Sequence, residues 1–232
     1  MGFFSEEHII VQDFSKFYTK SGKVSDLVVV LYSKDENLQW KYLDYFSKDN
    51  QDFYFVQMVW MHLLGESKEI NEQCQKLIIW SDGAKQHFKQ AKTLYWFSHL
   101  AATSGKQIIW NFFASNHGHS ICDSHTGNGK QQIARYEREM QEQILDLEDI
   151  QEVYENHLSY TTTFNISSPR EMKKTLTVKP FHGISYFHQF HFIDEGYVKC
   201  RVLSNEWPIE QHAIRLLEPS SIDGPGLLAY LI

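Results

Sequence analysis

The stretch LIIWSDGAKQHFK at residues 77–89 joins a short apolar run to an acidic turn and then to a helix-like segment. Its first four residues form an apolar run of the kind that makes a buried strand. Ser81, Asp82 and Gly83 follow. An aspartate at the carboxyl end of a buried strand either caps the next helix or belongs to a metal site. Spacing alone favours the capping role.

Strand-like and helix-like segments alternate on both sides of this stretch. The clearest strand is LVVVLYS at 27–33, because its β-branched residues run without interruption. Apolar residues at helical spacing predict an amphipathic helix over 51–64. The same criteria predict strands at 8–14, 77–82 and 107–114 and helices at 85–103 and 131–158. This alternation predicts an α/β sheet core, a domain over residues 1–157.

The sequence changes character after the last of these helices. Residues 161–171 form a polar break, and the segments after it alternate like short antiparallel strands. These segments are TLTVKPF, SYFHQFHFI and YVKCRVLS. We therefore expect a small β-rich C-terminal appendage over 160–217. The apolar end of the tail leaves open whether the chain is a fragment of a longer one.

The composition is that of a folded protein. The chain has 232 residues, of which 42% are hydrophobic, and its formal net charge is -7. This charge argues against a protein that coats nucleic acid through bulk positive charge, although it allows a local basic patch. Three sparsely placed cysteines indicate reduced thiols. The sequence has no secretory signal and no apolar run near the length of a membrane span, which predicts an intracellular protein without a membrane partner.

Acidic residues at strand ends are the first candidates for chemistry. Asp13 lies on the strand IIVQDF, Asp82 ends the strand at 77–82, and Asp123 lies beyond the strand at 107–114. Clustered carboxylates raise one another's pKa unless a cation neutralises them. Mg²⁺ suits such a cluster, and two ions about 4 Å apart can stabilise both the attacking and the leaving oxygen of a phosphoryl transfer.

The segment 115–130 reads as an ordered functional loop because it is rich in Gly, Ser, Asn and His. It offers a set of possible zinc ligands, namely His117, His119, Cys122, Asp123 and His125. Their spacing matches no standard closed zinc site, so zinc and a plain polar loop both stay open. The acidic segment 137–155 reads as a solvated helix face, with Glu137 as an alternative third metal carboxylate.

Three separated segments together resemble a known family. The Asp13-Phe14 pair, the SDG and FK of 81–89, and the segment FFASNHGHSICDSHTGNGK at 112–130 occur in this order. They resemble a eukaryotic group of DDE-type, RNase H-like transposase-derived proteins. That group carries an Asp-Phe pair on its first strand, then an SDG…FK segment, and then a His-Gly segment followed by Asp and Lys. The resemblance covers residues 8–132, and the C-terminal segments also look like the family's last piece.

The resemblance implies an RNase H-like mixed sheet of five strands flanked by helices. Its metal-binding and catalytic acids would be Asp13, Asp82 and Asp123, which would hold two Mg²⁺ (or Mn²⁺) ions. These ions would activate water, and then a freed 3′-hydroxyl, for attack on DNA phosphodiesters. The implied partner is DNA, the implied location is the nucleus, and such proteins generally act as dimers or larger assemblies. The candidate nucleic-acid contacts are Lys85, Lys89, His117 and Lys130.

The sequence also departs from the family. Gly118-His119-Ser120 stands where the family has Gly-Lys-Gly, and Ser124 stands where it has Gly after the last aspartate. Only twelve residues separate Phe14 from the strand at 27–33, which predicts a shortened or missing hairpin. These departures support a second hypothesis, a catalytically inactive, transposon-derived scaffold that binds DNA or protein. A zinc-stabilised loop or zinc-dependent hydrolysis at 117–125 is the third.

Overall fold

The computed structural model describes residues 7–32, 40–66, 70, 74–83, 88–113, 120–167, 178–202 and 212–215. The strands are β1 (Glu7–Thr19), β2 (Gly22–Tyr32), β3 (Trp40–Ser47), β4 (Lys76–Ser81), β5 (Gln107–Phe112), β6 (Thr161–Asn165), β7 (Gln189–Asp194), β8 (Tyr197–Arg201) and β9 (His212–Arg215). The helices are α1 (Phe53–Glu66), α2 (Ala91–Ser104), α3 (Ile121–Met140) and α4 (Leu147–His157), with a 3-10 turn at Ile184–Tyr186.

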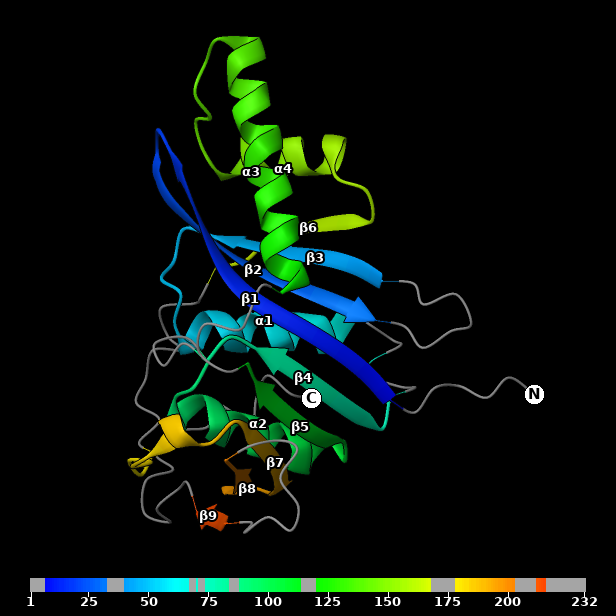
Figure 1. Ribbon diagram of the computed structural model, residues 1–232, viewed down its shortest axis with the longest axis vertical. Coiled ribbons are helices and arrows are strands. Elements are labelled where there is room, and N and C mark those ends of the chain that lie inside the picture. The colour runs from blue at the N-terminus through cyan, green and yellow to red at the C-terminus, as the bar shows by residue number, and fades with distance from the viewer. Residues whose placement is uncertain are drawn as a thin grey trace, which may run out of the picture.

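The strands form one mixed sheet (Figure 1), in the order β6-β3-β2-β1-β4-β5-β7-β8-β9. Strand β2 runs antiparallel to both β1 and β3, and β1, β4 and β5 run parallel to one another. Parallel neighbours need a crossover connection, which α2 supplies between β4 and β5. The predicted α/β fold, a mixed sheet flanked by helices, is confirmed.

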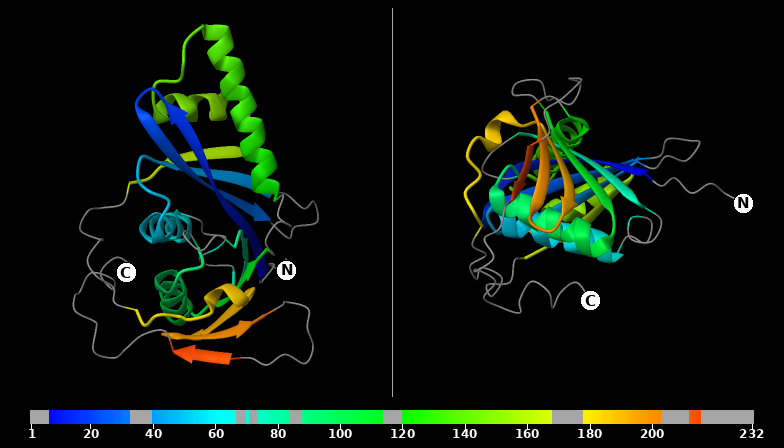
Figure 2. Two further views of the ribbon diagram at one scale, coloured as in Figure 1. Left: turned by 60° about the vertical axis from the view of Figure 1, so that its left-hand side comes forward. Right: turned by 90° about the horizontal axis from the view of Figure 1, so that it is seen from below.

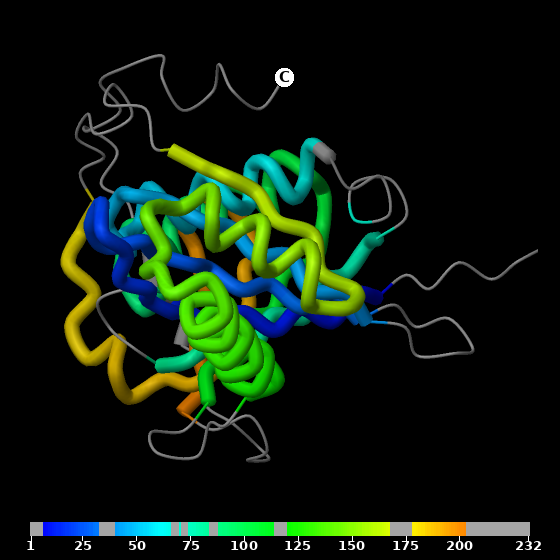
Figure 3. Tube along the Cα trace, turned by 90° about the horizontal axis from the view of Figure 1, so that it is seen from above, coloured from blue at the N-terminus to red at the C-terminus, as the bar shows by residue number. Residues whose placement is uncertain are grey.

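The helices cover both faces of the sheet. Side chains of β2 alternate between the two faces, as a strand requires. Leu27 and Val29 join the core under α1 and α2, whereas Val28 and Val30 pack against Cys122 of α3. Seen from above, α3 is nearly end-on beside the strands (Figure 3). The left-hand view of Figure 2 shows α3 rising at one end of the molecule, and the right-hand view, from below, shows α1 and α2 packed along the sheet. We call the side covered by α3 and α4 the α3 face.

The helix predicted over 51–64 is confirmed by α1, and the helix predicted over 85–103 is observed as α2, which begins at Ala91. The single helix predicted over 131–158 is wrong. The chain forms α3 and α4 instead, and α3 ends where Gln141 adopts a left-handed conformation with φ 55°. The carboxylate of Glu137 accepts a hydrogen bond from the Ile144 N–H at 3.0 Å, which fixes the turn between the helices.

The β1–β2 hairpin is complete, so the prediction of a shortened or missing hairpin is wrong. Strand β1 runs to Thr19, which pairs with Gly22 across a two-residue turn. The N–H groups of Lys20 and Ser21 in this turn donate to the carbonyls of Ile144 and Leu145 at 3.0 and 2.8 Å. The α3–α4 connection therefore supplies the hydrogen bonds that hold the tip of the hairpin.

The C-terminal region is β-rich, as expected, and its strands continue the same sheet. Strand β7 pairs antiparallel with β5, and β8 and β9 follow in antiparallel order. Strand β6 pairs with β3 at the other end of the sheet. Residues 175–177 of the segment TLTVKPF lie outside the described residues, and residues 178–181, which are described, form no strand, contrary to the expectation. None of the described helices has the length and apolar character needed to cross a membrane.

Candidate functional site

Asp13 and Asp82 are neighbours at the carboxyl ends of two parallel strands. The register of β1 against β4 runs to Gln12 opposite Ser81, so Asp13 and Asp82 are the next residues on each chain. Paired strands lie about 4.8 Å apart. Asp13 lies on the α3 face, where it lines a pocket with Cys122 and Asp123. Continued alternation beyond Trp80, which also faces that side, directs Asp82 the same way. Asp13 and Asp82 are separated by 69 positions in the sequence, the same separation as between Gln12 and Ser81. The fold thus brings together two acids that are far apart in the chain.

The third predicted acid, Asp123, approaches the same edge from the first turn of α3. Its carboxylate accepts a hydrogen bond from the Ser120 N–H at 2.8 Å, which satisfies one of the free donors at the helix N-terminus. Cys122, the residue before Asp123, packs against the sheet, and its Sγ lies 3.6 Å from the carbonyl oxygen of Val11. The start of α3 therefore packs directly on β1, two residues before Asp13.

The charges of the three acids interact. The pKa of Asp13 is raised to about 7, first because burial disfavours its charged form. A hydrogen bond from the Phe14 N–H, 2.7 Å long, opposes the shift, and the negative charges of Asp82 and Asp123 add to it. A cation placed among these carboxylates would oppose this shift, because it favours the charged form of Asp13.

The chemistry of the three carboxylates fits a divalent cation, although they do not form a closed set of ligands. Carboxylate oxygens are the ligands that Mg²⁺ and Mn²⁺ prefer. Within the part of the chain that the structure describes, no group of three or more His, Cys, Asp or Glu side chains is arranged to hold a metal ion. The carboxylates of Asp13, Asp82 and Asp123 would have to turn toward a common point to share one.

A pocket of about 400 Å³ opens beside Asp13, between β1 and α3. Its lining includes the acids Asp13 and Asp123 and two cationic residues, Lys16 and Lys130, both exposed. The Lys130 ammonium lies 5.5 Å from the centre of the Phe17 ring. The remaining lining residues are Phe14, Ser15, Gln51, Cys122, Thr126 and Gly127. The pocket thus offers both carboxylates and ammonium groups to one ligand.

A second group of acids lies deeper on the α3 face and was missed by sequence reasoning. Asp26 of β2 and Asp44 of β3 are fully buried, and His125 Nε2 of α3 lies 2.9 Å from the Asp44 carboxylate. We call Asp26, Asp44 and His125 the buried acid cluster. Burial raises the pKa of both aspartates. Tyr42 stacks on His125 with the ring centres 3.9 Å apart, so the cluster joins α3 to β3.

The predicted nucleic-acid contacts have different environments. Lys130 lines the pocket, as described above. Lys89 is only 3% exposed, its ammonium lies over the Phe112 ring at 5.0 Å, and it donates to the Ser185 carbonyl at 3.4 Å. Lys89 therefore precedes α2 and points into the protein, away from the solvent-exposed position that a nucleic-acid contact needs. Lys85 and His117 lie outside the described residues.

Three of the predicted zinc ligands lie within the described residues, and the structure does not bring them together around one point. Cys122, Asp123 and His125 belong to the first turns of α3 rather than to a loop. Cys122 is buried, which raises the pKa of its thiol and disfavours the thiolate that zinc requires. His125 instead contacts Asp44. His117 and His119 lie outside the described residues.

Glu137, the alternative third carboxylate, lies at the wrong end of α3. It is fourteen residues from Asp123, which corresponds to roughly 21 Å along a helix. Its carboxylate accepts the hydrogen bond from Ile144 that fixes the α3–α4 turn. Asp123 is therefore the acid of α3 that lies near Asp13.

Comparison with known proteins gives a family match and a weak structural match. No curated protein matches the sequence. A solved structure, the crystal structure of NurA with manganese, is 12% identical over 85% of this chain and 42% of that chain, with a TM-score of 0.21. This chain thus spans less than half the length of that protein, and a TM-score so low does not indicate a shared fold. A family model described as a domain of unknown function (DUF8701) matches residues 4–204. The chain therefore belongs to the DUF8701 family.

Proposed function

We propose that the protein catalyses metal-dependent phosphoryl transfer on DNA, cleaving and joining strands as a transposase-derived, RNase H-like enzyme. Asp13, Asp82 and Asp123 would hold Mg²⁺ or Mn²⁺, as two ions. The observation that supports this most is the environment of Asp13, whose pKa is raised by burial and by the charges of the other two acids. Acids that disfavour one another's ionisation are typical of sites where a cation supplies the missing charge.

Each element has a defined task in this proposal. Bound divalent ions would supply Lewis-acid stabilisation of the phosphoryl oxygens. Strands β1 and β4 fix the positions of Asp13 and Asp82, and α3 brings Asp123 to them. Lys16 and Lys130 line the pocket beside these acids and would contact the phosphates that flank the reacting one. DNA as the partner, a nuclear location and a homo-oligomer are parts of the same proposal.

The reaction is tested with the wild-type protein, a supercoiled plasmid and a labelled oligonucleotide. We expect nicked or joined products with Mn²⁺ or Mg²⁺ and only background levels after a chelator removes the metal. Ca²⁺ serves as a further control, because it binds oxygen ligands with a looser geometry than Mg²⁺. Equal product with the metal and with the chelator would contradict the proposal.

A second function, a DNA- or protein-binding scaffold without catalysis, is favoured by one specific observation. No described group of three ligand side chains is arranged to hold a metal ion. Calorimetric titration with Mn²⁺ separates the two functions. A protein that binds DNA in a filter assay but takes up no Mn²⁺ is the scaffold, whereas uptake of Mn²⁺ that raises cleavage rules the scaffold out.

A further inference from the structure

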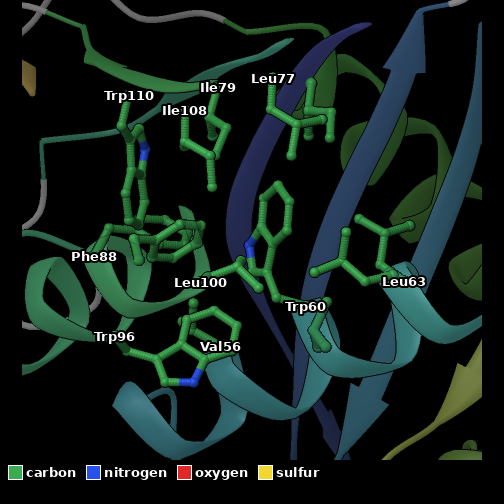
Figure 4. Packing of buried hydrophobic residues seen from close by; sticks show 14 of the residues in the cluster. Val56, Trp60, Leu63, Leu77, Ile79, Phe88, Trp96, Leu100, Ile108 and Trp110 are labelled. Carbon is green, nitrogen blue, oxygen red and sulfur yellow. The ribbon is translucent and has the colours of Figure 1, made fainter. Parts of the chain in front are cut away.

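A network of four buried polar side chains lies immediately next to Asp13 and Asp82. Gln12 of β1 donates from Nε2 to the Ser81 Oγ of β4 at 3.0 Å. The Trp60 indole N–H of α1 donates to Gln12 Oε1 at 3.0 Å, and the Trp110 indole N–H of β5 donates to the same Ser81 Oγ at 2.7 Å. All four side chains have zero exposure. Figure 4 shows Trp60 and Trp110 within the packed layer of apolar side chains.

Only one arrangement of hydrogen-bond donors and acceptors is compatible with the chemistry of this network. An indole N–H can only donate, so Trp60 must meet the carbonyl oxygen of the Gln12 amide. The amide nitrogen of Gln12 is then directed at Ser81, whose oxygen accepts from both Gln12 and Trp110. Reversing the amide would bring two donors together where the side chains are fully buried. The network therefore fixes which residue of β1 stands opposite which residue of β4.

The position of the network is what links it to the acids. Gln12 and Ser81 form the last pair in the β1–β4 register, and each directly precedes one aspartate. The network lies on the face of the sheet covered by α1 and α2, and the aspartates lie on the α3 face. A slip of one residue would reverse the faces of every side chain on one strand. Only the observed register places Asp13 and Asp82 side by side on one face.

We propose that Gln12 and Ser81 are positioning residues that hold the two aspartates at a fixed separation through the backbone of β1 and β4. Their hydrogen bonds define where each strand ends relative to the other. The role in cation binding rests on the function proposed above, whereas the effect on the relative placement of Asp13 and Asp82 does not.

The test compares Ser81→Ala with Ser98→Ala. Ser98 is also fully buried, and its Oγ makes two hydrogen bonds, donating to the Tyr95 carbonyl at 2.6 Å and accepting from the Gly196 N–H at 2.8 Å. Both variants lose a buried hydroxyl, but Ser98 lies in α2, away from the acids. By calorimetry we expect Ser81→Ala to bind Mn²⁺ at least about tenfold more weakly than wild type. Ser98→Ala should bind as the wild type does.

A second readout needs neither metal nor DNA. The pH titration of the Asp13 carboxyl carbon is followed by NMR, with and without Asp82→Asn. We expect Asp82→Asn to shift this titration in the wild-type and Ser98→Ala backgrounds, and to shift it less than half as far in Ser81→Ala. Gln12→Met serves as the second variant if Ser81→Ala does not fold.

The outcomes separate the two proposals. If the wild type binds no Mn²⁺, the proposed enzymatic function fails, and the NMR readout alone decides the positioning role. If Asp82→Asn shifts the Asp13 titration equally in the Ser81→Ala, Ser98→Ala and wild-type backgrounds, the positioning role is overturned.

Discussion

Replacing Asp82 with asparagine is expected to lower the rate of metal-dependent DNA cleavage at least about 10³-fold. A carboxylate that helps hold a catalytic ion contributes several kcal/mol to transition-state stabilisation, and roughly 4 kcal/mol corresponds to this factor. Asparagine keeps the shape of the side chain but removes its charge. Asp82 is exposed, so the substitution should leave the fold intact. Plasmid nicking at saturating Mn²⁺ measures the rate.

The matched control for this experiment is Glu142→Gln, which also removes one negative charge. The Glu142 side chain is 64% exposed and lies 3.5 Å from Lys20, an exposed ion pair of small energetic value. It lies just beyond the C-terminal end of α3, far from Asp82. We expect Glu142→Gln to cleave at the wild-type rate. Equal rates for wild type and Asp82→Asn, with both proteins folded, would remove Asp82 from the proposed site.

Replacing Gly129 with alanine is expected to destabilise the protein by about 3 kcal/mol, the upper end of the range for overpacked sites. A Cβ at this position of α3 would lie 2.7 Å from Cε2 of Tyr154 and closer still to its Cζ and hydroxyl. Tyr154 cannot easily move, because its ring is held edge-on by Phe17 and Phe46, with ring centres 6.0 and 5.2 Å away. Helix α3 would have to lift away from α4. Urea denaturation followed by circular dichroism measures the loss.

Gly127 provides the matched control on the same helix. A Cβ there would meet no atom within 4 Å. Gly127→Ala should therefore stabilise the protein by about 0.5–1 kcal/mol, because alanine restricts the unfolded chain and favours helix. The loss caused by Gly129→Ala should shrink in a Tyr154→Leu background, where the crowding ring is absent. Similar denaturation midpoints for Gly127→Ala and Gly129→Ala would contradict the close packing of α3 on α4.

Apolar patterning was enough to predict the strands that lie at the centre of the sheet. The uninterrupted run at 27–33 identifies a strand that is buried on both faces, and the run before Asp82 identifies a strand whose alternate residues are buried. The ends of the hairpin strands were harder to predict from the sequence, because β1 continues beyond its apolar part to Thr19. The hydrogen bonds that hold its tip come from residues 144 and 145, which are over 120 positions away.

Other features could not be predicted from local sequence either, because they too depend on residues far away in the chain. Strand β3, with the sequence WKYLDYFS, carries a buried aspartate where an apolar residue is expected, since Asp44 finds its partner in His125, 81 positions later. The break between α3 and α4 contains neither Gly nor Pro and arises at Gln141. Gln12 is a polar residue within the apolar run before Asp13, and this is a local sequence signal of the buried network that the prediction did not use.

The most direct test of the central claim is the NMR titration of the Asp13 carboxyl group with and without saturating Mg²⁺. Without the metal its pKa is expected near 7, because burial and the charges of Asp82 and Asp123 disfavour ionisation. A cation held by these three carboxylates favours the charged form and must lower that pKa. We predict a fall of at least about two units with Mg²⁺ in the wild type and a much smaller fall in Asp82→Asn. An Asp13 titration that Mg²⁺ leaves unchanged would contradict a cation site at these residues.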